Sequence, residues 1–138
     1  MILLIDNSEI DEMILSLFDN DYNFVRREQF EVRNDLSEKM LINIDTFLNS
    51  GNLKKENLNG IVVNQGPGSY TGLRISLATA NLIACSLNIP VIGYCGRLND
   101  KKIADKTKKE LKGQGKKFEN AVVPFYKNPP HITKNKHC

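Results

Sequence analysis

The chain has 138 residues, 41% hydrophobic and 25% charged, a composition typical of one soluble folded domain. It holds no run of the roughly 18 apolar residues that a membrane helix needs, and its apolar start lacks the basic region of a signal peptide, so we expect a cytoplasmic protein without membrane contact. The net charge of +3 is unevenly spread: residues 1–100 carry 8 basic against 13 acidic residues, and residues 101–138 carry 11 against 3. This basic end indicates a polyanionic partner such as RNA, or a solvated linker.

Three antiparallel strands are expected first. Ile2–Ile5 is an apolar run that ends at the polar residues Asp6-Asn7-Ser8, a pattern that predicts a buried strand with a polar tip. The segments Met13–Phe18 and Asn23–Val32 flank a turn-rich tripeptide, Asp19-Asn20-Asp21. This arrangement predicts a hairpin.

A helix over Leu36–Ser50 follows. Asp35 and Glu38 have the spacing of a capping box, in which each residue hydrogen-bonds to the backbone near the other. One helical face carries the apolar side chains Leu36, Met40, Leu41, Ile44, Phe47 and Leu48. Gly51 is a natural end for the helix. The β-branched run Ile61–Val63 then predicts a buried parallel strand.

The second helix, Thr71–Asn88, is apolar nearly all round, and Arg74 is its one charged residue. Such a helix must be buried on two sides. The sheet of the same domain covers one side, and either a second layer or a partner chain covers the other. We favour a partner, and we predict an interface on both helices formed by Met40, Ile44, Phe47, Leu73, Leu77, Ala80, Ala84 and Leu87.

A last strand over Pro90–Cys95 completes the order βββαβαβ, whose final two strands are parallel because helices connect them. This order predicts an α/β fold, a mixed sheet with helices packed on it, as in the ribonuclease-H-like half-unit of actin-like ATPase (ASKHA) domains. Residues 1–99 would form this domain. Residues 100–119 would form a lysine-rich linker or short helix, and residues 120–138 a C-terminal tail.

The segment Gly66-Pro67-Gly68-Ser69-Tyr70-Thr71-Gly72-Leu73-Arg74 lies between the predicted buried strand and the second helix. Its glycines permit unusual backbone angles, and Ser69 or Thr71 can cap the helix. A helix start of this kind favours an anion, although a well-capped turn without a ligand fits equally. The Lys-Ser/Thr end of a P-loop is missing. Weak candidates for a bound cofactor are Asp6, Ser8, Gly66, Gly68 and Ser69.

No catalytic residue and no metal site are predicted from the sequence. The three cysteines have no metal-binding spacing, and the two histidines, His131 and His137, lie near the C-terminal end. The segment Gly66–Arg74, GPGSYTGLR, resembles the TsaB (YeaZ) family signature GPGSFTGLR, with Tyr70 in place of phenylalanine. Ile2–Ser8 is similar to the family's opening strand. The tail from Pro124 to Thr133 resembles the ending of longer members that carry a second domain, so the resemblance implies a shortened form.

The resemblance implies a non-catalytic dimerisation subunit in bacterial tRNA threonylcarbamoyladenosine biosynthesis. Its partners would be a TsaD-like enzyme, which modifies the adenosine next to the tRNA anticodon, and a TsaE-like ATPase. ATP and metal would bind to these partners, and tRNA would bind to the assembled complex. TsaD-like proteins bind metal through paired histidines, and residues 1–130 contain none. The alternatives are a nucleotide- or phosphate-binding module and a structural homodimer that uses the same helices.

Overall fold

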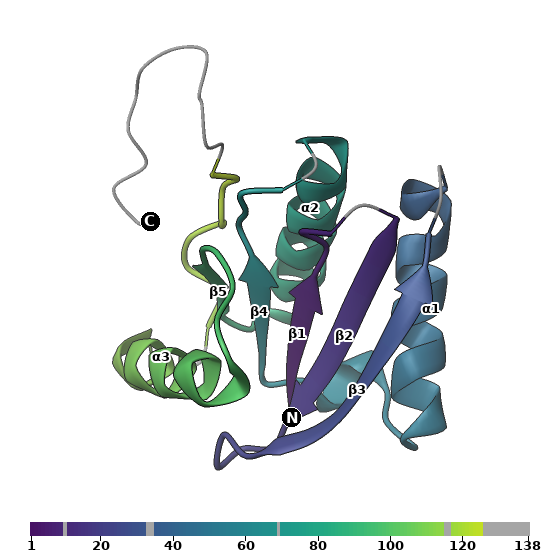
Figure 1. Ribbon diagram of the computed structural model, residues 1–138. Helices are drawn as coiled ribbons and strands as arrows, with labels where there is room; N and C mark the ends of the chain where they lie inside the picture. The colour runs from purple at the N-terminus through teal and green to yellow at the C-terminus, as the bar shows by residue number, and fades with distance from the viewer. Residues whose placement is uncertain (10, 33–34, 69, 115–116, 126–138) are drawn as a thin grey trace.

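The computed structural model describes residues 1–9, 11–32, 35–68, 70–114 and 117–125 (Figure 1). A five-stranded mixed sheet has the order β3-β2-β1-β4-β5, with α1 and α2 on one face and α3 on the other. In chain order, the elements are β1 (Ile2–Asp6), β2 (Glu12–Phe18), β3 (Phe24–Glu31), α1 (Leu36–Ser50), a short 3₁₀ turn (Lys55–Asn57), β4 (Gly60–Asn64), α2 (Tyr70–Leu87), β5 (Val91–Tyr94) and α3 (Asp100–Gln114). The predicted strand and helix order is confirmed. No helix within these ranges is long and apolar enough to cross a membrane.

The strand pairing brings three strand ends to one edge of the sheet. β1 pairs with β2 and β2 with β3 in antiparallel fashion, whereas β1, β4 and β5 run parallel to one another. Because carboxyl ends of parallel strands meet at one edge, Asp6, Asn64 and Tyr94 are neighbours there.

The turn between β2 and β3 is held by Asp19. Its carboxylate accepts hydrogen bonds from the backbone N–H groups of Asp21 and Asn23, at 2.9 and 3.0 Å.

Both faces of the central strands are buried. Leu3 and Ile5 of β1 point into a core that α1 and α2 cover, whereas Ile2 and Leu4 point into a second core that includes Ile103 of α3. Alternate residues of one strand therefore serve opposite layers, as expected for the inner strands of a layered α/β sheet.

The predicted interface residues require a correction, because most of them lie inside the chain's own core. Met40, Ile44, Phe47, Leu73, Leu77, Ala80 and Ala84 are all at most 2% exposed, and Leu87 packs partly buried against the same core. The physical reason is that α2 is covered by the sheet and by α1, and residues near the C-terminal end add to this cover. Phe118 and Val122 pack against the same core. A partner is not needed to bury this side of the helix.

The capping box predicted for α1 is wrong. Asp35 makes no side-chain hydrogen bond to the start of the helix, and its carboxylate instead pairs with Lys39 at 3.0 Å. At the other end, the guanidinium of Arg26 lies 4.1 Å from the Phe47 ring centre and donates to the Phe47 carbonyl at 2.5 Å. A Cβ atom at Gly51 would lie 2.8 Å from this guanidinium. Glycine therefore leaves room for the contact that joins β3 to the end of α1.

The lysine-rich stretch was predicted to be either a linker or a short helix. It forms α3. Beyond it, the described residues of the C-terminal part run back over the domain. The Asn81 amide donates to the Val122 carbonyl at 2.8 Å and accepts from the Val122 N–H at 2.9 Å. The Gln65 amide donates to the Val123 carbonyl at 2.9 Å. The predicted resemblance of the tail lies mostly outside the described residues, which end at 125.

Candidate functional site

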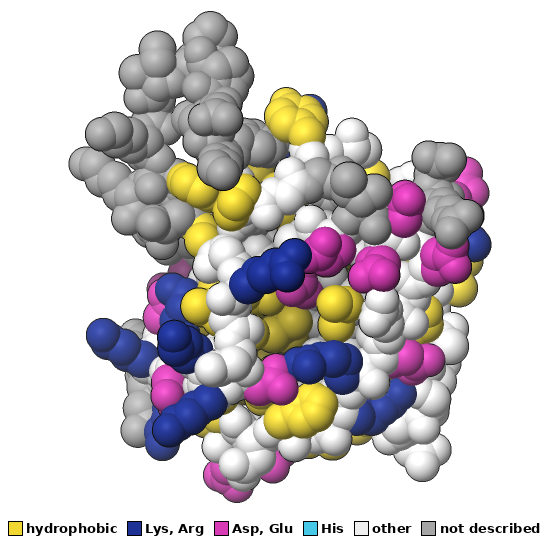
Figure 2. Space-filling model, in the orientation of Figure 1, with side chains coloured by type: hydrophobic (Ala, Val, Ile, Leu, Met, Phe, Trp, Pro, Cys, Tyr) yellow, Lys and Arg dark blue, Asp and Glu magenta, His cyan; other side chains and the backbone are white. Residues whose placement is uncertain are grey.

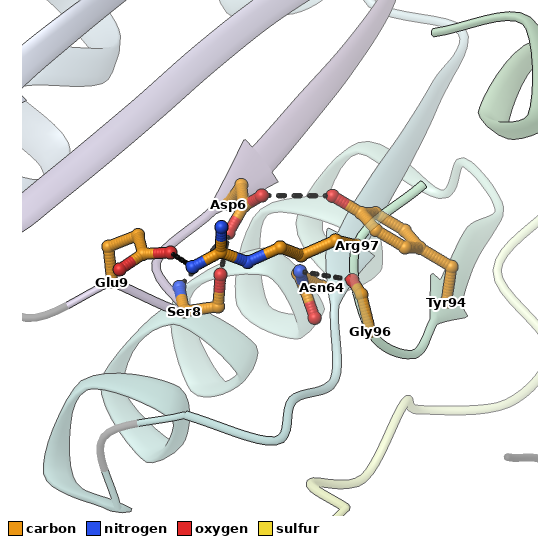
Figure 3. A network of polar contacts seen from close by, with 7 residues as sticks. All are labelled: Asp6, Ser8, Glu9, Asn64, Tyr94, Gly96 and Arg97. Atoms are coloured by element: carbon orange, nitrogen blue, oxygen red, sulfur yellow. Dashed lines mark hydrogen bonds and ion pairs between the residues drawn. The ribbon is translucent and has the colours of Figure 1, made fainter. Parts of the chain in front are cut away.

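The polar residues at the ends of β1 and β5 form hydrogen bonds with one another (Figure 3). One oxygen of the Asp6 carboxylate accepts from the N–H and the hydroxyl of Ser8, at 3.0 and 2.7 Å. The other oxygen accepts from the Tyr94 hydroxyl at 3.2 Å. The carboxylate is thus held by three donors of its own chain.

The Tyr94 phenol is a fixed hydrogen-bond donor. Burial raises its pKa far above the usual range, and the neighbouring negative charge of Asp6 raises it further. The phenol therefore keeps its proton at physiological pH and cannot serve as a base there. Its position, 3% exposed in the core beneath α3, ties the end of β5 to the end of β1.

The glycine-rich turn between β4 and α2 is tied to the loop after β5. Gly66 has a φ of +109°, and its N–H donates to the Asn64 side chain at 2.8 Å. The Asn64 amide donates to the Gly96 carbonyl at 3.2 Å, and the Gly96 N–H donates to the Gly66 carbonyl at 2.8 Å. A side chain at Gly66 would be strained by this backbone angle and would also meet Phe125 O at 2.7 Å.

Gly68 lets the same turn pack against the tip of β1. A Cβ atom at this position would lie 2.7 Å from the Ser8 carbonyl oxygen. Asn7 is buried beside it, and its amide donates to the Gly72 carbonyl at 3.2 Å. The structure therefore brings four of the five predicted candidates together: Asp6, Ser8, Gly66 and Gly68. The fifth, Ser69, lies outside the described residues.

Arg74 lies at the start of α2. Its guanidinium lies 5.4 Å from the ring centre of Tyr70, one helical turn earlier. Both side chains are on the surface, with Tyr70 56% exposed. The contact found is therefore a cation–π contact within one helix.

A groove of about 390 Å³ opens beside this network, on the face of the sheet that α3 partly covers. We call it the central groove. Apolar side chains including Leu4, Ile14 and Ile103 line it, and charged side chains stand around them. Figure 2 shows this hollow with an apolar floor and basic and acidic groups at its edge.

The charged groups around the central groove are paired across it. Arg97, after β5, pairs with Glu9, after β1. Arg27 of β3 pairs with Asp100 at the start of α3. Sequence reasoning missed all four residues, because each pair joins positions that are far apart along the chain and no local motif marks them.

Two arginines and three carboxylates line the central groove: Arg27, Arg97, Asp6, Glu9 and Asp100. The Arg97 side chain is 86% exposed. Within the described residues, no group of three or more His, Cys, Asp or Glu side chains is placed to hold a metal ion. The Ser8 hydroxyl is held by Asp6, and no histidine precedes position 131 to activate it.

The sheet order, the three antiparallel strands followed by two parallel ones, and the helices on both faces define a ribonuclease-H-like, actin-like domain. Solved structures support this fold. YeaZ from Pseudomonas aeruginosa superposes with a TM-score of 0.58 at 20% identity, over 68% of this chain and 43% of that one. An uncharacterized protein with similarity to peptidase YEAZ from Pseudomonas aeruginosa superposes with a TM-score of 0.59 at 22% identity, over 83% and 49%.

The chain is also similar in sequence to known proteins. A family model described as TsaD, tRNA N6-adenosine threonylcarbamoyltransferase, matches residues 31–95. The tRNA threonylcarbamoyladenosine biosynthesis protein TsaB of Bacillus subtilis is 31% identical over 60% of this chain and 31% of that protein. TsaB of Buchnera aphidicola subsp. Schizaphis graminum is 30% identical over 67% and 43%. These similarities support the TsaB family, and the chain spans less than half the length of these relatives.

Proposed function

We propose that this chain is a non-catalytic subunit in tRNA threonylcarbamoyladenosine biosynthesis, and that it binds and supports a TsaD-like enzyme. Two curated relatives carry the name of a threonylcarbamoyladenosine biosynthesis protein, which supports the pathway. ATP and metal would then bind to the TsaD-like enzyme and to a TsaE-like ATPase that joins it.

The outward side of α1 and α2 is the surface proposed for the partner, and it is the observation that carries the proposal. Ile42 is 62% exposed, Leu41 is 42% exposed, and Leu82 is 64% exposed. With the exposed residues Ala78 and Cys85 of α2, they form what we call the outer helix face. Exposed apolar side chains on two helices that pack against each other are typical of a surface that another protein covers. This face replaces the inner residues predicted from the sequence, and it could also serve a homodimer.

The contacts at the strand ends support a non-catalytic role. The Asp6 carboxylate is occupied by Ser8 and Tyr94, and the acids Glu9 and Asp100 are paired with arginines. A peptidase activity, which the description of one structural neighbour suggests for YEAZ, would require an activated nucleophile. The described residues contain no histidine that could take the proton of Ser8, and His131 and His137 lie outside them.

Binding to the catalytic partner can be measured directly by titrating the chain with a TsaD-like subunit in a calorimeter. We expect Leu82→Glu and Ile42→Glu to weaken binding at least tenfold, because each places a charge in an apolar contact. Val25→Glu is the matched control, since Val25 is 46% exposed on β3, away from the outer helix face. If both helix variants bind as tightly as this control, the proposed surface is wrong.

A second candidate function is phosphate or nucleotide binding in the central groove, which the positive charge and exposure of Arg97 favour. Titration with a fluorescent nucleotide tests it. Binding that Arg97→Ala abolishes would support this function. An absence of binding at millimolar nucleotide would exclude it and leave the partner surface unaffected.

A further inference from the structure

A second groove lies between the tip of the β2–β3 hairpin and α3, away from the outer helix face. Its volume is about 320 Å³. We call it the aromatic groove, because its lining includes three aromatic side chains from the hairpin and two lysines from α3: Phe18, Tyr22, Phe24, Lys101 and Lys108. None of these five residues lines the central groove.

The Phe24 ring is exposed and yet held in place. It is 44% exposed, and its ring centre lies 6.0 Å from that of Phe18, with the two planes at 74°. Phe18 itself is 3% exposed, so it is a fixed support. The guanidinium of Arg27 lies 5.1 Å from the Phe24 ring centre on the same sheet face. A ring that is supported from below and open to solvent is suited to stack a flat heterocycle, such as a nucleobase.

The helix beside this ring presents positive charge to solvent. Lys101, Lys102, Lys108 and Lys109 are exposed on α3, and Figure 2 shows basic side chains gathered over this helix at the lower left. Lys101 and Lys108 are seven residues apart, so their backbones lie about 10 Å apart along the helix. This distance lets the two ammonium groups meet different phosphates of one strand.

Acidic groups also face the aromatic groove and limit its affinity for a negatively charged ligand. Asp21, Asp100 and Asp105 line it, and of these Asp100 is paired with Arg27. On the helix, Lys106 is paired with Glu110 at 3.3 Å. We therefore expect weak binding that depends on salt, in which stacking adds to the phosphate contacts.

We propose that the aromatic groove and the adjoining lysines of α3 bind a short single-stranded stretch of RNA. In this arrangement a base stacks on Phe24, and flanking phosphates pair with Lys101 and Lys108. The choice of RNA as the polyanion rests on the proposed function in tRNA modification. The binding itself uses the face away from the outer helix face, and it is measured without a partner protein.

The test is fluorescence anisotropy of the full chain with a labelled oligouridylate of about ten nucleotides, a length suited to one small binding site. Phe24→Ala should lower the affinity by about 5- to 150-fold, the range for losing one stacked base. Phe24→Leu should have a similar effect while keeping the apolar contact with Phe18. Val25→Ala, at a neighbouring exposed position outside the groove, should bind like the unchanged protein.

The lysines are tested by the salt dependence of the same titration. Replacing both Lys101 and Lys108 by Gln should reduce the slope of log affinity against log salt by about 1.4, because each phosphate contact on a single strand contributes about 0.7. The matched control replaces Lys102 and Lys109 by Gln, which removes the same charge from the same helix outside the groove. It should change the slope less.

Three results would overturn the proposal. Phe24→Ala and Phe24→Leu could bind as tightly as Val25→Ala, which would exclude stacking. The two lysine pairs could have equal effects, which would indicate charge attraction without a site. An RNA duplex could bind as tightly as the single strand, which would exclude recognition of unpaired bases. All three leave binding to the catalytic partner untouched, so they are separate from failure of the proposed function.

Discussion

Ala80→Arg should strongly destabilise the protein, because Ala80 lies inside the core. Its side chain is 0% exposed on the side of α2 that packs against the sheet and α1. Arginine would bury an unpaired charge there at a cost on the order of 3–5 kcal/mol. Domains of this size have about 5–15 kcal/mol of stability in total, so the change removes a large share of it.

Thermal unfolding followed by circular dichroism measures this effect. A loss of 3–5 kcal/mol corresponds to a fall of roughly 10–20 °C in Tm for a domain of this length. Ala78→Arg is the matched control, because Ala78 lies two residues away on the exposed side of the same helix. We expect its Tm to stay within about 2 °C of the unchanged protein. Equal Tm values for the two variants would refute the burial of this side of α2.

Three further changes test other contacts. Gly68→Val should lower the free energy of unfolding in urea by about 1–3 kcal/mol, because a Cβ atom there would lie 2.7 Å from the Ser8 carbonyl oxygen. An unchanged urea midpoint would contradict that close approach. Asn81→Ala should lower the free energy of unfolding by about 1–2 kcal/mol. It should also speed hydrogen exchange of the Val122 amide, because it removes the oxygen that accepts this hydrogen bond. Exchange at the original rate would show that the contact is absent in solution. The hydrogen bond from the backbone N–H of Asn23 lowers the pKa of Asp19. The Asp19 carboxylate therefore stabilises the fold at pH values above the pKa of Asp in the unfolded chain, near 4. This contribution is lost as the pH falls through the lower pKa that Asp19 has in the folded protein. Asp19→Asn should therefore weaken the acid dependence of stability, and an identical pH profile would argue against the turn contact.

Local patterns in the sequence are sufficient to predict most of the fold. The apolar run before Asp6 and the turn-rich tripeptide at Asp19 predict the first three strands because they reflect local backbone preferences. The bounds of α1, Leu36–Ser50, agree with its helical periodicity. The cap predicted at Asp35 does not form: the backbone there has φ −132° and ψ 28°, and the carboxylate pairs with Lys39, which sequence spacing does not reveal.

The orientation of α2 could not be predicted from its sequence. Apolar side chains such as Leu77 and Leu82 occur on opposite sides of the helix, and the first is 2% exposed whereas the second is 64% exposed. Periodicity shows that such a helix is covered on more than one side, but it does not show which side meets the sheet. The side assigned to a partner was therefore the inner one.

The candidate site was predictable in part. Asp6, Ser8 and the glycines of the β4–α2 turn could be found because the tips of parallel strands meet at one edge. The pairing of Arg97 with Glu9 spans 88 positions, and that of Arg27 with Asp100 spans 73. Such pairs depend on the complete sheet order and on where α3 lies, so no local sequence pattern marks them.

The proposed role is tested most directly by threonylcarbamoyladenosine formed on tRNA in a reconstituted reaction, measured by mass spectrometry of the digested nucleosides. The reaction would contain a TsaD-like enzyme, a TsaE-like ATPase, ATP and threonylcarbamoyl donor, with or without this chain. We predict that product formation depends on the chain, that Leu82→Glu reduces it, and that Val25→Glu does not. Equal product without the chain, or product formed by the chain in the absence of the TsaD-like enzyme, would contradict a non-catalytic supporting role.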